Sequence, residues 1–167
     1  MIDITNTHAF FYREWPSNFH NDPFVMDGHK FQWSEQAFMY LKAKFFKDDD
    51  TAEKILLAKT PMEAKTLGRQ VKNYVDAEWD KVRYDAMLKA NRERFAQNPA
   101  VKIQLLEHRF DGKTFVEASP VDRIWGIGMA QGERGIDDEK NWLGQNLLGK
   151  VLTQVRNELI AKEKQNG

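Results

Sequence analysis

The spacing of apolar residues predicts that most of the chain is helical. Across residues 76–97, apolar side chains recur every three or four positions, at Trp79, Val82, Ala86 and Ala90, which is the period of a helix with one buried face. Several shorter stretches have the same period. The predicted helices cover residues 34–46, 51–59, 61–68, 76–97, 99–108 and 146–162.

A few short segments have the composition of strands instead. They are rich in aromatic or β-branched residues, and one pair flanks Asp27-Gly28, where both residues tolerate the positive φ of a hairpin turn. Strands that precede and follow a block of helices predict an α+β fold in which helix predominates, built as one domain over residues 1–167 with a small sheet. The predicted strands cover residues 8–12, 24–26, 30–32, 113–118 and 124–128.

Polar residues, proline and glycine mark the predicted helix ends. Ser34 is expected to cap the first helix, and Asp48–Asp50 to break it and cap the next. Thr60–Glu63 combines a threonine cap, a proline at the first helical position and a capping-box glutamate. Gly68 is expected to end that helix. Residues 130–141 are glycine-rich and charged without an apolar period, so we expect a mobile loop there.

Composition narrows the function classes. The chain has 167 residues, with 25 Lys and Arg against 25 Asp and Glu. A domain that holds nucleic acid through its backbone usually carries a basic excess, so nucleic acid is expected only as a modified substrate. The chain has no cysteine, which excludes disulfides, thiolate zinc sites and a cysteine nucleophile. The five Trp and eleven Phe could fill a core or wall a pocket for a flat ligand.

The printed sequence predicts a cytoplasmic protein. Its first residues lack the basic start and apolar run of a signal peptide. No apolar stretch is long enough to cross a bilayer. No membrane partner is therefore expected, and the sequence does not indicate an oligomeric state.

Common metal and cofactor motifs are missing. The histidines do not occur at metal-ligand spacing, so no metal site is predicted. Gly126-Ile127-Gly128 lacks the third glycine of a dinucleotide fingerprint and does not open a helix. There is no Gly-x-Ser-x-Gly elbow. No cofactor is predicted. The remaining candidate is chemistry carried out by carboxylates near aromatic residues.

Two carboxylates are candidates for that chemistry. Glu35 lies in the first turn of a predicted helix, where it also complements the helix dipole. Lys42 lies two turns further along the helix and on the same face as Glu35. A solvent-exposed stripe of charged residues would explain this pair equally well. Asp122 lies in a loop close to Trp125, where an aspartate can equally satisfy its own turn.

The ordered motifs of the chain resemble those of the YbiA/NADAR family. The resemblance covers residues 8–160. The family has a tyrosine two positions after its Glu-Gln or Glu-His, where this chain has Ala37-Phe38, and residues 129–140 form a variable loop that bears on substrate specificity. The matching segments are Phe10–Tyr12, Ser17–Phe19, Ser34–Gln36, Lys42-Ala43, Ala64–Arg69, Trp79-Asp80, Met87, Phe115–Glu117, Asp122–Gly128, Trp142–Gly149 and Val155-Arg156.

The resemblance implies hydrolysis of a bond between ribose C1′ and a nitrogen. The implied substrates are phosphoribosylamino-pyrimidine intermediates of riboflavin synthesis. The alternatives are removal of ADP-ribose from guanine bases, and a non-catalytic module that binds ADP-ribose or a nucleotide. Either enzyme would act on a small ribosyl-phosphate or ADP-ribosyl substrate.

Site roles follow from the same resemblance and from the chemistry of glycosidases. Glu35 would activate water or stabilise the oxocarbenium-like ribose, and Asp122 would hold ribose hydroxyls or share the acid–base work. Lys42 would form a Schiff base with the ring-opened sugar or contact phosphate. Trp125, Trp33 and Trp15 could stack on the base, but an aromatic at each of these positions could equally belong to the core, and for Trp33 the core is favoured. The predicted substrate-binding residues are Asn18, Arg69, Trp125, Gly126, Trp33 and Asn146, of which the two asparagines could equally be a turn former and a helix cap.

Overall fold

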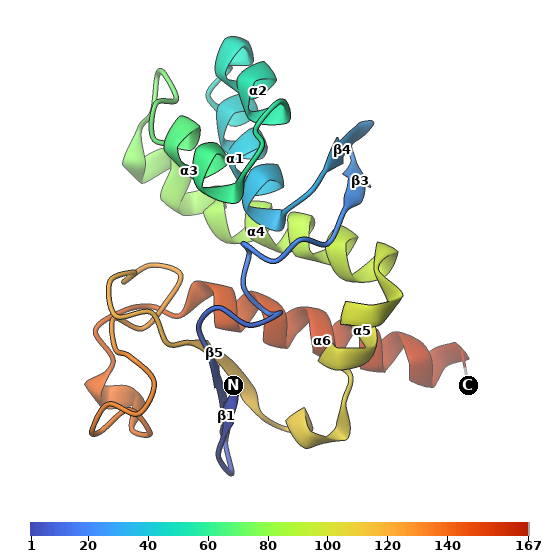
Figure 1. Ribbon diagram of the computed structural model, residues 1–167, viewed down its shortest axis with the longest axis vertical. Helices are drawn as coiled ribbons and strands as arrows, with labels where there is room; N and C mark the ends of the chain where they lie inside the picture. Colours follow the sequence, from blue (N-terminus) through green and yellow to red (C-terminus); the bar gives the residue numbers. More distant parts are fainter. Residues whose placement is uncertain (167) are drawn as a thin grey trace. The chain divides into compact units, whose positions relative to one another are not determined.

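A three-stranded sheet in the order β1-β2-β5 organises one part of the chain (Figure 1). The computed structural model describes residues 1–166, and the strands are β1 (Asp3–Ile4), β2 (His8–Phe11) and β5 (Thr114–Glu117). β1 is antiparallel to β2, whereas β2 is parallel to β5. A parallel pair requires a long connection, and here residues 18–99 lie between the two strands in sequence.

These strands belong to the first of two compact units, which we call the sheet unit. It comprises residues 1–17 and the described residues from 100 onward. Besides the sheet, it contains α5 (Pro99–Leu105, except for its first residue), α6 (Leu147–Asn166) and the short 3-10 helices η1 (His108–Phe110) and η2 (Glu139–Asn141). α6 packs against β5.

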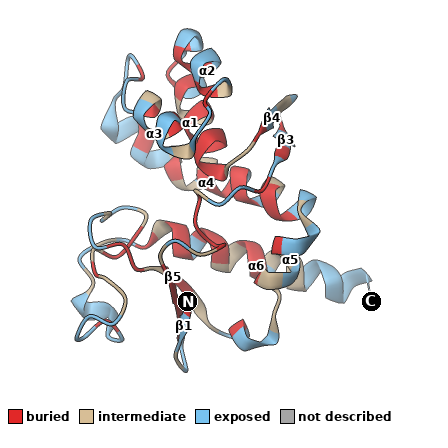
Figure 2. Ribbon diagram, viewed as in Figure 1, coloured by how far each residue is buried: buried red, intermediate tan, exposed pale blue. Residues whose placement is uncertain are grey.

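The core of the sheet unit forms around β2, whose four residues are all buried (Figure 2). A strand buried on every position needs cover on both faces. One part of that cover comes from Ile127, Met129 and Ile136, which pack with Phe10 and Val116. The loop after β5 therefore contributes to the core.

The second unit, residues 18–99, is mainly helical, and we call it the helical unit. A hairpin of β3 (Phe24–Met26) and β4 (His29–Phe31) precedes four helices. α1 is central because it contacts each of the other three, and most of its residues are buried (Figure 2). The helices are α1 (Ser34–Phe45), α2 (Asp49–Leu56), α3 (Pro61–Gly68) and α4 (Asp76–Gln97).

The predicted fold class is confirmed. Over the described residues the chain is α+β with six α-helices and small sheets. The hairpin turn is as expected, with φ of 52° at Asp27 and 80° at Gly28, and α4 has the predicted bounds. The domain assignment over residues 1–167 stays a prediction. No helix among the described residues is long and apolar enough to span a membrane.

Two of the three predicted caps are confirmed and one is wrong. Asp48 Oδ1 accepts from the Thr51 amide, and Thr60 Oγ1 from the Glu63 amide. Ser34 does not cap α1: the N-cap position is Trp33, without a side-chain bond. Ser34 is instead the first helical residue, and its hydroxyl is used elsewhere.

Gly68 ends α3 as predicted, but for a different reason. It has no positive φ, and a Cβ at this position would lie 1.9 Å from Met39 Sδ. A side chain there would collide with α1, so glycine permits the close approach of the two helices.

The predicted strand at residues 124–128 is wrong. The segment consists mainly of bends and belongs to neither sheet, although the Ile127 amide donates one bond to the Glu117 carbonyl of β5 at 3.0 Å. Gly128 has a φ of 70°, a conformation that interrupts an extended run. The segment packs against residues 143–148 through single backbone bonds, such as Leu143 N to Ile127 O at 2.8 Å.

The remaining differences concern β1, which was not predicted, several helix and strand ends, and one loop. α2 begins at Asp49 rather than at residue 51 and ends at Leu56, α5 ends at Leu105, and α6 runs to Asn166. Residues 130–141 form a loop as predicted, but it is anchored rather than free. It contains the buried Ile136 and η2, because an apolar residue in an aperiodic segment can still reach the core.

Candidate active site

The start of α1 is held by a buried network around Asn18. Ser34 Oγ donates to Asn18 Oδ1 at 2.7 Å, and the Glu35 amide donates to the Asn18 carbonyl at 3.2 Å. Asn91 Nδ2 also reaches Asn18 Oδ1, at 3.4 Å, while Asn18 Nδ2 points at Met87 Sδ at 3.1 Å. The loop before the helix is therefore bonded to α1 and α4, which fixes the backbone that carries Glu35.

Gln36 strengthens the same helix start. Its Oε1 accepts from the Gln32 amide at 2.8 Å, and its Nε2 donates to the Ile55 carbonyl at 2.9 Å. Two members of the Ser-Glu-Gln motif thus hold backbone in place. The third, Glu35, is also buried, with 7% of its surface exposed.

Lys42 lies on the same helix face as Glu35, seven residues further. That spacing is two turns, about 10 Å along the axis, and the charge of Glu35 acts on Lys42. Lys42 is half-buried. The two side chains therefore lie on one face of α1 and influence each other electrostatically.

The surroundings of Lys42 disfavour its charged form. Burial is the largest cause that lowers the pKa of Lys42 below its ordinary value of 10.5, and Arg83 and Arg69 lower it further. Glu35 and Asp76 act in the opposite direction. Arg69 is exposed at the C-cap of α3. The structure therefore brings Glu35, Lys42 and Arg69 into one electrostatic neighbourhood.

Three residues that sequence reasoning missed belong to this neighbourhood. Lys42 Nζ lies 4.5 Å from the centre of the Tyr74 ring, and Tyr74 Oη donates to Asp76 Oδ1 at 2.6 Å. Arg83 Nη2 donates to the same oxygen at 3.0 Å, and Arg83 Nε lies 3.5 Å from Asp80. Asp76 and Arg83 are two turns apart on one helix, a spacing that could have indicated the pair.

Asp122 is engaged by its own turn. Its Oδ1 accepts from the Ile124 amide at 2.9 Å and from the Trp125 amide at 2.8 Å. Its own amide donates to Ser119 Oγ at 3.1 Å. Asp122 and Trp125 are therefore close together, as predicted, and the carboxylate supports the backbone of the loop.

Asn146 is fully buried and serves as a partner for the edge of β5. Its Oδ1 accepts from the Glu117 amide and its Nδ2 donates to the Phe115 carbonyl, both at 3.0 Å. Its own amide donates to the Gly126 carbonyl at 3.0 Å, and its φ is 54°. It does not cap α6 through its side chain. Both polar groups of this side chain are used by backbone.

The glycine and tryptophans predicted to bind substrate have different environments. Gly126 is buried, and a Cβ there would lie 2.9 Å from Ser119 Cβ, so the position requires glycine. Trp33 and Trp125 are half-buried. Trp15 is a core residue, edge-on to Phe110 and to Phe115 at 6.0 Å each. Of the three tryptophans, only Trp33 and Trp125 keep surface for a ligand.

The predicted site residues thus form two groups, one in each unit. Those of the helical unit surround α1, and those of the sheet unit lie on the loop from Asp122 to the start of α6. The helical-unit group contains Asn18, Trp33, Glu35, Lys42 and Arg69, and the sheet-unit group contains Asp122, Trp125, Gly126 and Asn146.

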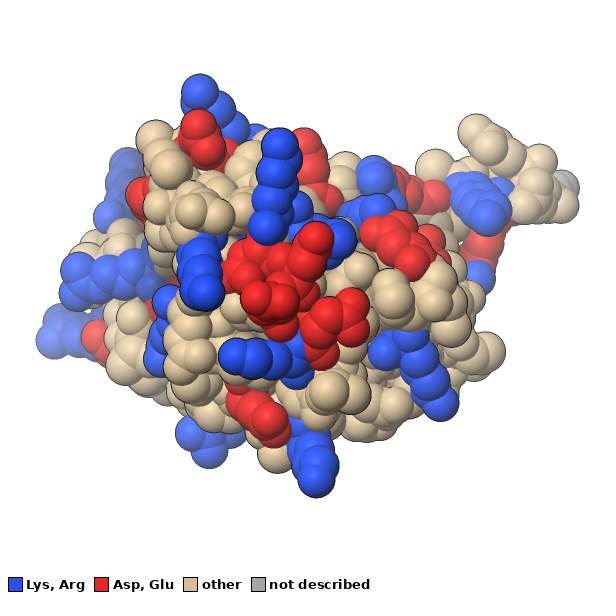
Figure 3. Space-filling model, turned by 90° about the horizontal axis from the view of Figure 1, so that it is seen from above, with Lys and Arg blue, Asp and Glu red and all other residues tan. Residues whose placement is uncertain are grey.

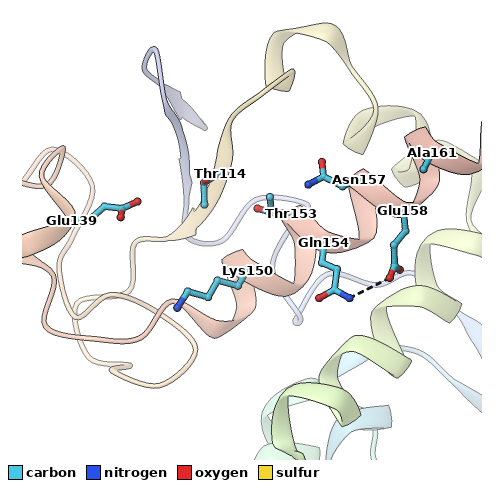
Figure 4. A pocket seen from close by; sticks show the side chains of 8 residues that line it. All are labelled: Thr114, Glu139, Lys150, Thr153, Gln154, Asn157, Glu158 and Ala161. Carbon is cyan, nitrogen blue, oxygen red and sulfur yellow. Dashed lines mark hydrogen bonds between the residues drawn. The ribbon is translucent and has the colours of Figure 1, made fainter. Parts of the chain in front are cut away.

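An open groove of about 720 Å³ runs along α6 (Figure 4). None of the predicted site residues lines it. Within it, Gln154 Nε2 donates to Glu158 Oε2 at 3.2 Å, so part of its polar lining is internally bonded. The lining residues are Thr114, Glu139, Lys150, Thr153, Gln154, Asn157, Glu158 and Ala161.

Surface charge is mixed. On the face drawn in Figure 3, acidic side chains gather near the centre and Lys and Arg surround them. This face offers no extended basic surface of the kind that binds a nucleic-acid backbone. In residues 1–166, no three His, Cys, Asp or Glu side chains are grouped so that they could hold a metal ion.

Comparison with known proteins places these motifs in a family. The profile of the NADAR domain family matches residues 5–160. N-glycosidase R617 of Acanthamoeba polyphaga mimivirus is 42% identical over 75% of this chain and 72% of its own length. Riboflavin biosynthesis protein PYRR of Zea mays is 32% identical over 90% of this chain but 25% of its own length.

The fold agrees with this assignment. The NMR structure of the E. coli protein YbiA aligns with a TM-score of 0.76 and 28% identity, over 97% of this chain and 90% of that one. Protein irg-1 of Caenorhabditis elegans is 38% identical over 96% of this chain and 84% of its own length. The resemblance inferred from the sequence is confirmed: the chain belongs to the NADAR domain family.

Proposed function

We propose that this protein cleaves the bond between ribose C1′ and an amine nitrogen of phosphoribosylamino-pyrimidine intermediates of riboflavin synthesis. The chain is an N-glycosidase, as its relative R617 is named. The riboflavin substrate class is supported by the similarity to PYRR, whose name refers to riboflavin biosynthesis. The observation that carries the chemical proposal is a half-buried lysine with a lowered pKa on the same helix face as a buried glutamate.

Lys42 has the properties of an amine nucleophile. A neutral amine attacks carbon, whereas an ammonium does not, and burial with Arg83 and Arg69 nearby favours the neutral form. In the ring-opened substrate, C1′ is doubly bonded to the exocyclic nitrogen. The Lys42 amine adds to C1′, the base leaves as its free amine, and C1′ becomes doubly bonded to Lys42 Nζ. Water then releases the sugar as an aldehyde and restores the lysine amine.

Glu35 supplies the proton transfers that these steps require. Ring opening, departure of the base and attack of water each move a proton to or from nitrogen or oxygen. A buried carboxyl group on the same helix face, whose charge acts on Lys42, is the proposed general acid–base catalyst, a role that contributes about 100- to 10,000-fold to a rate. Its backbone is fixed by Asn18, so its position is built into the fold.

Arg69 is the proposed contact for the ribose phosphate. It is exposed at the end of α3, and its charge acts on Lys42. An arginine suits this role because its guanidinium can donate two hydrogen bonds to phosphate oxygens. Lys42 is then available for the covalent step. The roles predicted for Asp122, Trp125, Trp33, Gly126 and Asn146 stay predictions.

The direct test is to incubate the protein with a phosphoribosylamino-pyrimidine and, separately, with ADP-ribosylated guanine, and to measure released base by mass spectrometry. We expect release from the first substrate, and a rate about 100-fold lower for Glu35→Gln, which keeps the shape of the side chain. Release from guanine alone would reassign the substrate class. Binding of ADP-ribose without cleavage of either would identify a non-catalytic module. Unchanged turnover in Glu35→Gln would contradict the role of Glu35.

A further inference from the structure

The loop between α3 and α4 is fixed to the end of α1 by several contacts. Asp48 Oδ2 accepts from the Lys72 amide at 2.9 Å. Asn73 has a left-handed φ of 65°, and its Nδ2 reaches the Phe46 carbonyl at 3.5 Å. The Phe46 ring meets the Tyr74 ring at 5.3 Å, edge to face. These contacts determine where Tyr74 lies.

The other side of Tyr74 is equally constrained. Its hydroxyl donates to Asp76 Oδ1 at 2.6 Å, and Arg83 Nη2 donates to that same oxygen at 3.0 Å. Burial and the hydrogen bond to Asp76 raise the pKa of Tyr74, so the hydroxyl keeps its proton and remains a donor. Asp76 joins the ring to a buried arginine of α4.

The Lys42 ammonium group lies 4.5 Å from the centre of this ring. An ammonium within about 6 Å of an aromatic face is attracted to it. Lysine has a flexible four-carbon stem and is positioned poorly without such a contact. A ring held by Phe46 on one side and by Asp76 on the other provides a fixed surface for this side chain.

We infer that Tyr74 is a positioning residue for Lys42: its ring supports and shields the amine, and Asp76 and Arg83 hold the ring in place. The inference rests on the proposed function in one respect, that Lys42 is the reacting amine. The charged groups that act on Lys42 are Arg83 and Asp76 from α4, Glu35 from α1 and Arg69 from α3. Removal of the ring leaves all of these charges present but admits water to the amine.

The test combines a chemical measurement with kinetics. Acetic anhydride is applied over a series of pH values to wild type, Tyr74→Ala and Tyr74→Phe, and labelling of Lys42 is followed by peptide mass spectrometry. Wild-type Lys42 is expected to be half labelled below pH 10.5. In Tyr74→Ala the half-labelling pH should rise toward 10.5, because the loss of burial, the largest cause of the lowered pKa, outweighs the loss of the attraction between ring and ammonium. Tyr74→Phe keeps the ring but loses the hydroxyl that bonds to Asp76, so its half-labelling pH should lie between those of wild type and Tyr74→Ala.

Lys44 is the internal control. It is exposed on the same helix, two residues away, and its ion pair with Asp49 is independent of Tyr74. Its labelling should be the same in all three proteins, and far-UV circular dichroism spectra that match wild type verify that the variants are folded. An unchanged half-labelling pH for Lys42 in Tyr74→Ala would overturn the inference.

Kinetics provide the second readout. Because a displacement of about 1 Å can cost about 100-fold in rate, we expect kcat of Tyr74→Ala to fall by about 10- to 100-fold with KM nearly unchanged. A rise in KM at constant kcat would instead make Tyr74 a substrate contact and overturn the positioning role. The labelling does not depend on turnover, so it decides the inference even if no N-glycosidic cleavage is found.

Discussion

The two groups of predicted site residues differ in what their side chains do. In the helical unit, Lys42 is half-buried with a pKa lowered by burial and by neighbouring arginines, and Glu35 shares its helix face. In the sheet unit, Asp122 and Asn146 use their side chains on backbone amides and carbonyls. The first group contains an amine whose pKa is perturbed, whereas Asp122 and Asn146 of the second group have side chains engaged by backbone.

This difference distinguishes residues that are candidates for catalysis from residues that stabilise the fold. A perturbed pKa that arises from burial and specific neighbours is typical of functional sites. A buried polar side chain that is fully hydrogen-bonded is typical of a structural element. Both kinds of residue belong to motifs of the same family, so membership of a motif does not by itself indicate a catalytic role.

The largest expected effect is the loss of the Lys42 amine. Lys42→Met keeps the length and apolar stem but removes the nucleophile, and we expect kcat to fall at least about 1,000-fold. The matched control is Lys44→Met, which removes an exposed lysine of the same helix and should leave kcat within about twofold. Steady-state assays of both variants measure the contrast. Equal rates in the two variants would remove the helical-unit group from the chemistry.

The second effect is on stability and comes from the sheet unit. Asn146→Ala leaves the Glu117 amide and the Phe115 carbonyl without their buried partner. Each unsatisfied group costs about 1–3 kcal/mol, so the free energy of unfolding should fall by about 2–6 kcal/mol in urea titrations. Asn141→Ala removes an exposed bond to Gly135 and should cost less than about 1 kcal/mol. A similar fall in the free energy of unfolding in both variants would show that the Asn146 bonds to β5 contribute no more than an exposed hydrogen bond.

The smallest effect should follow from Asp122→Asn. Asparagine keeps the Oδ1 that accepts from Ile124 and Trp125 but removes the charge. If the carboxylate supports the loop, kcat should stay within about threefold and stability within about 0.5 kcal/mol, measured by the same assays. A fall in kcat of about 100-fold would restore the acid–base role that the sequence predicted for Asp122.

Much of the fold could be predicted because its helices follow local rules. The bounds of α4 and the caps at Asp48 and Thr60 depend on neighbouring residues alone. The strand predicted at residues 124–128 failed because a short apolar run with two glycines has no local feature that distinguishes a paired strand from an unpaired loop. The cap predicted at Ser34 failed because its hydroxyl bonds to Asn18, sixteen residues away.

The site could be predicted only in part, for a similar reason. Glu35 and Lys42 are two turns apart on one helix, so their shared face follows from the sequence. Tyr74 and Arg83 come from other elements and meet Lys42 only after folding. The use of Asn146 by β5 is also a long-range contact that no local pattern contains.

Reductive trapping can show whether Lys42 is the reacting amine. The protein is mixed with the phosphoribosylamino-pyrimidine in the presence of borohydride, digested, and analysed by fragment mass spectrometry. We expect a substrate-dependent adduct in which the sugar carbon is joined to Lys42 Nζ as a secondary amine, with Lys44 unmodified. Release of base at the normal rate with no adduct on Lys42 would contradict it.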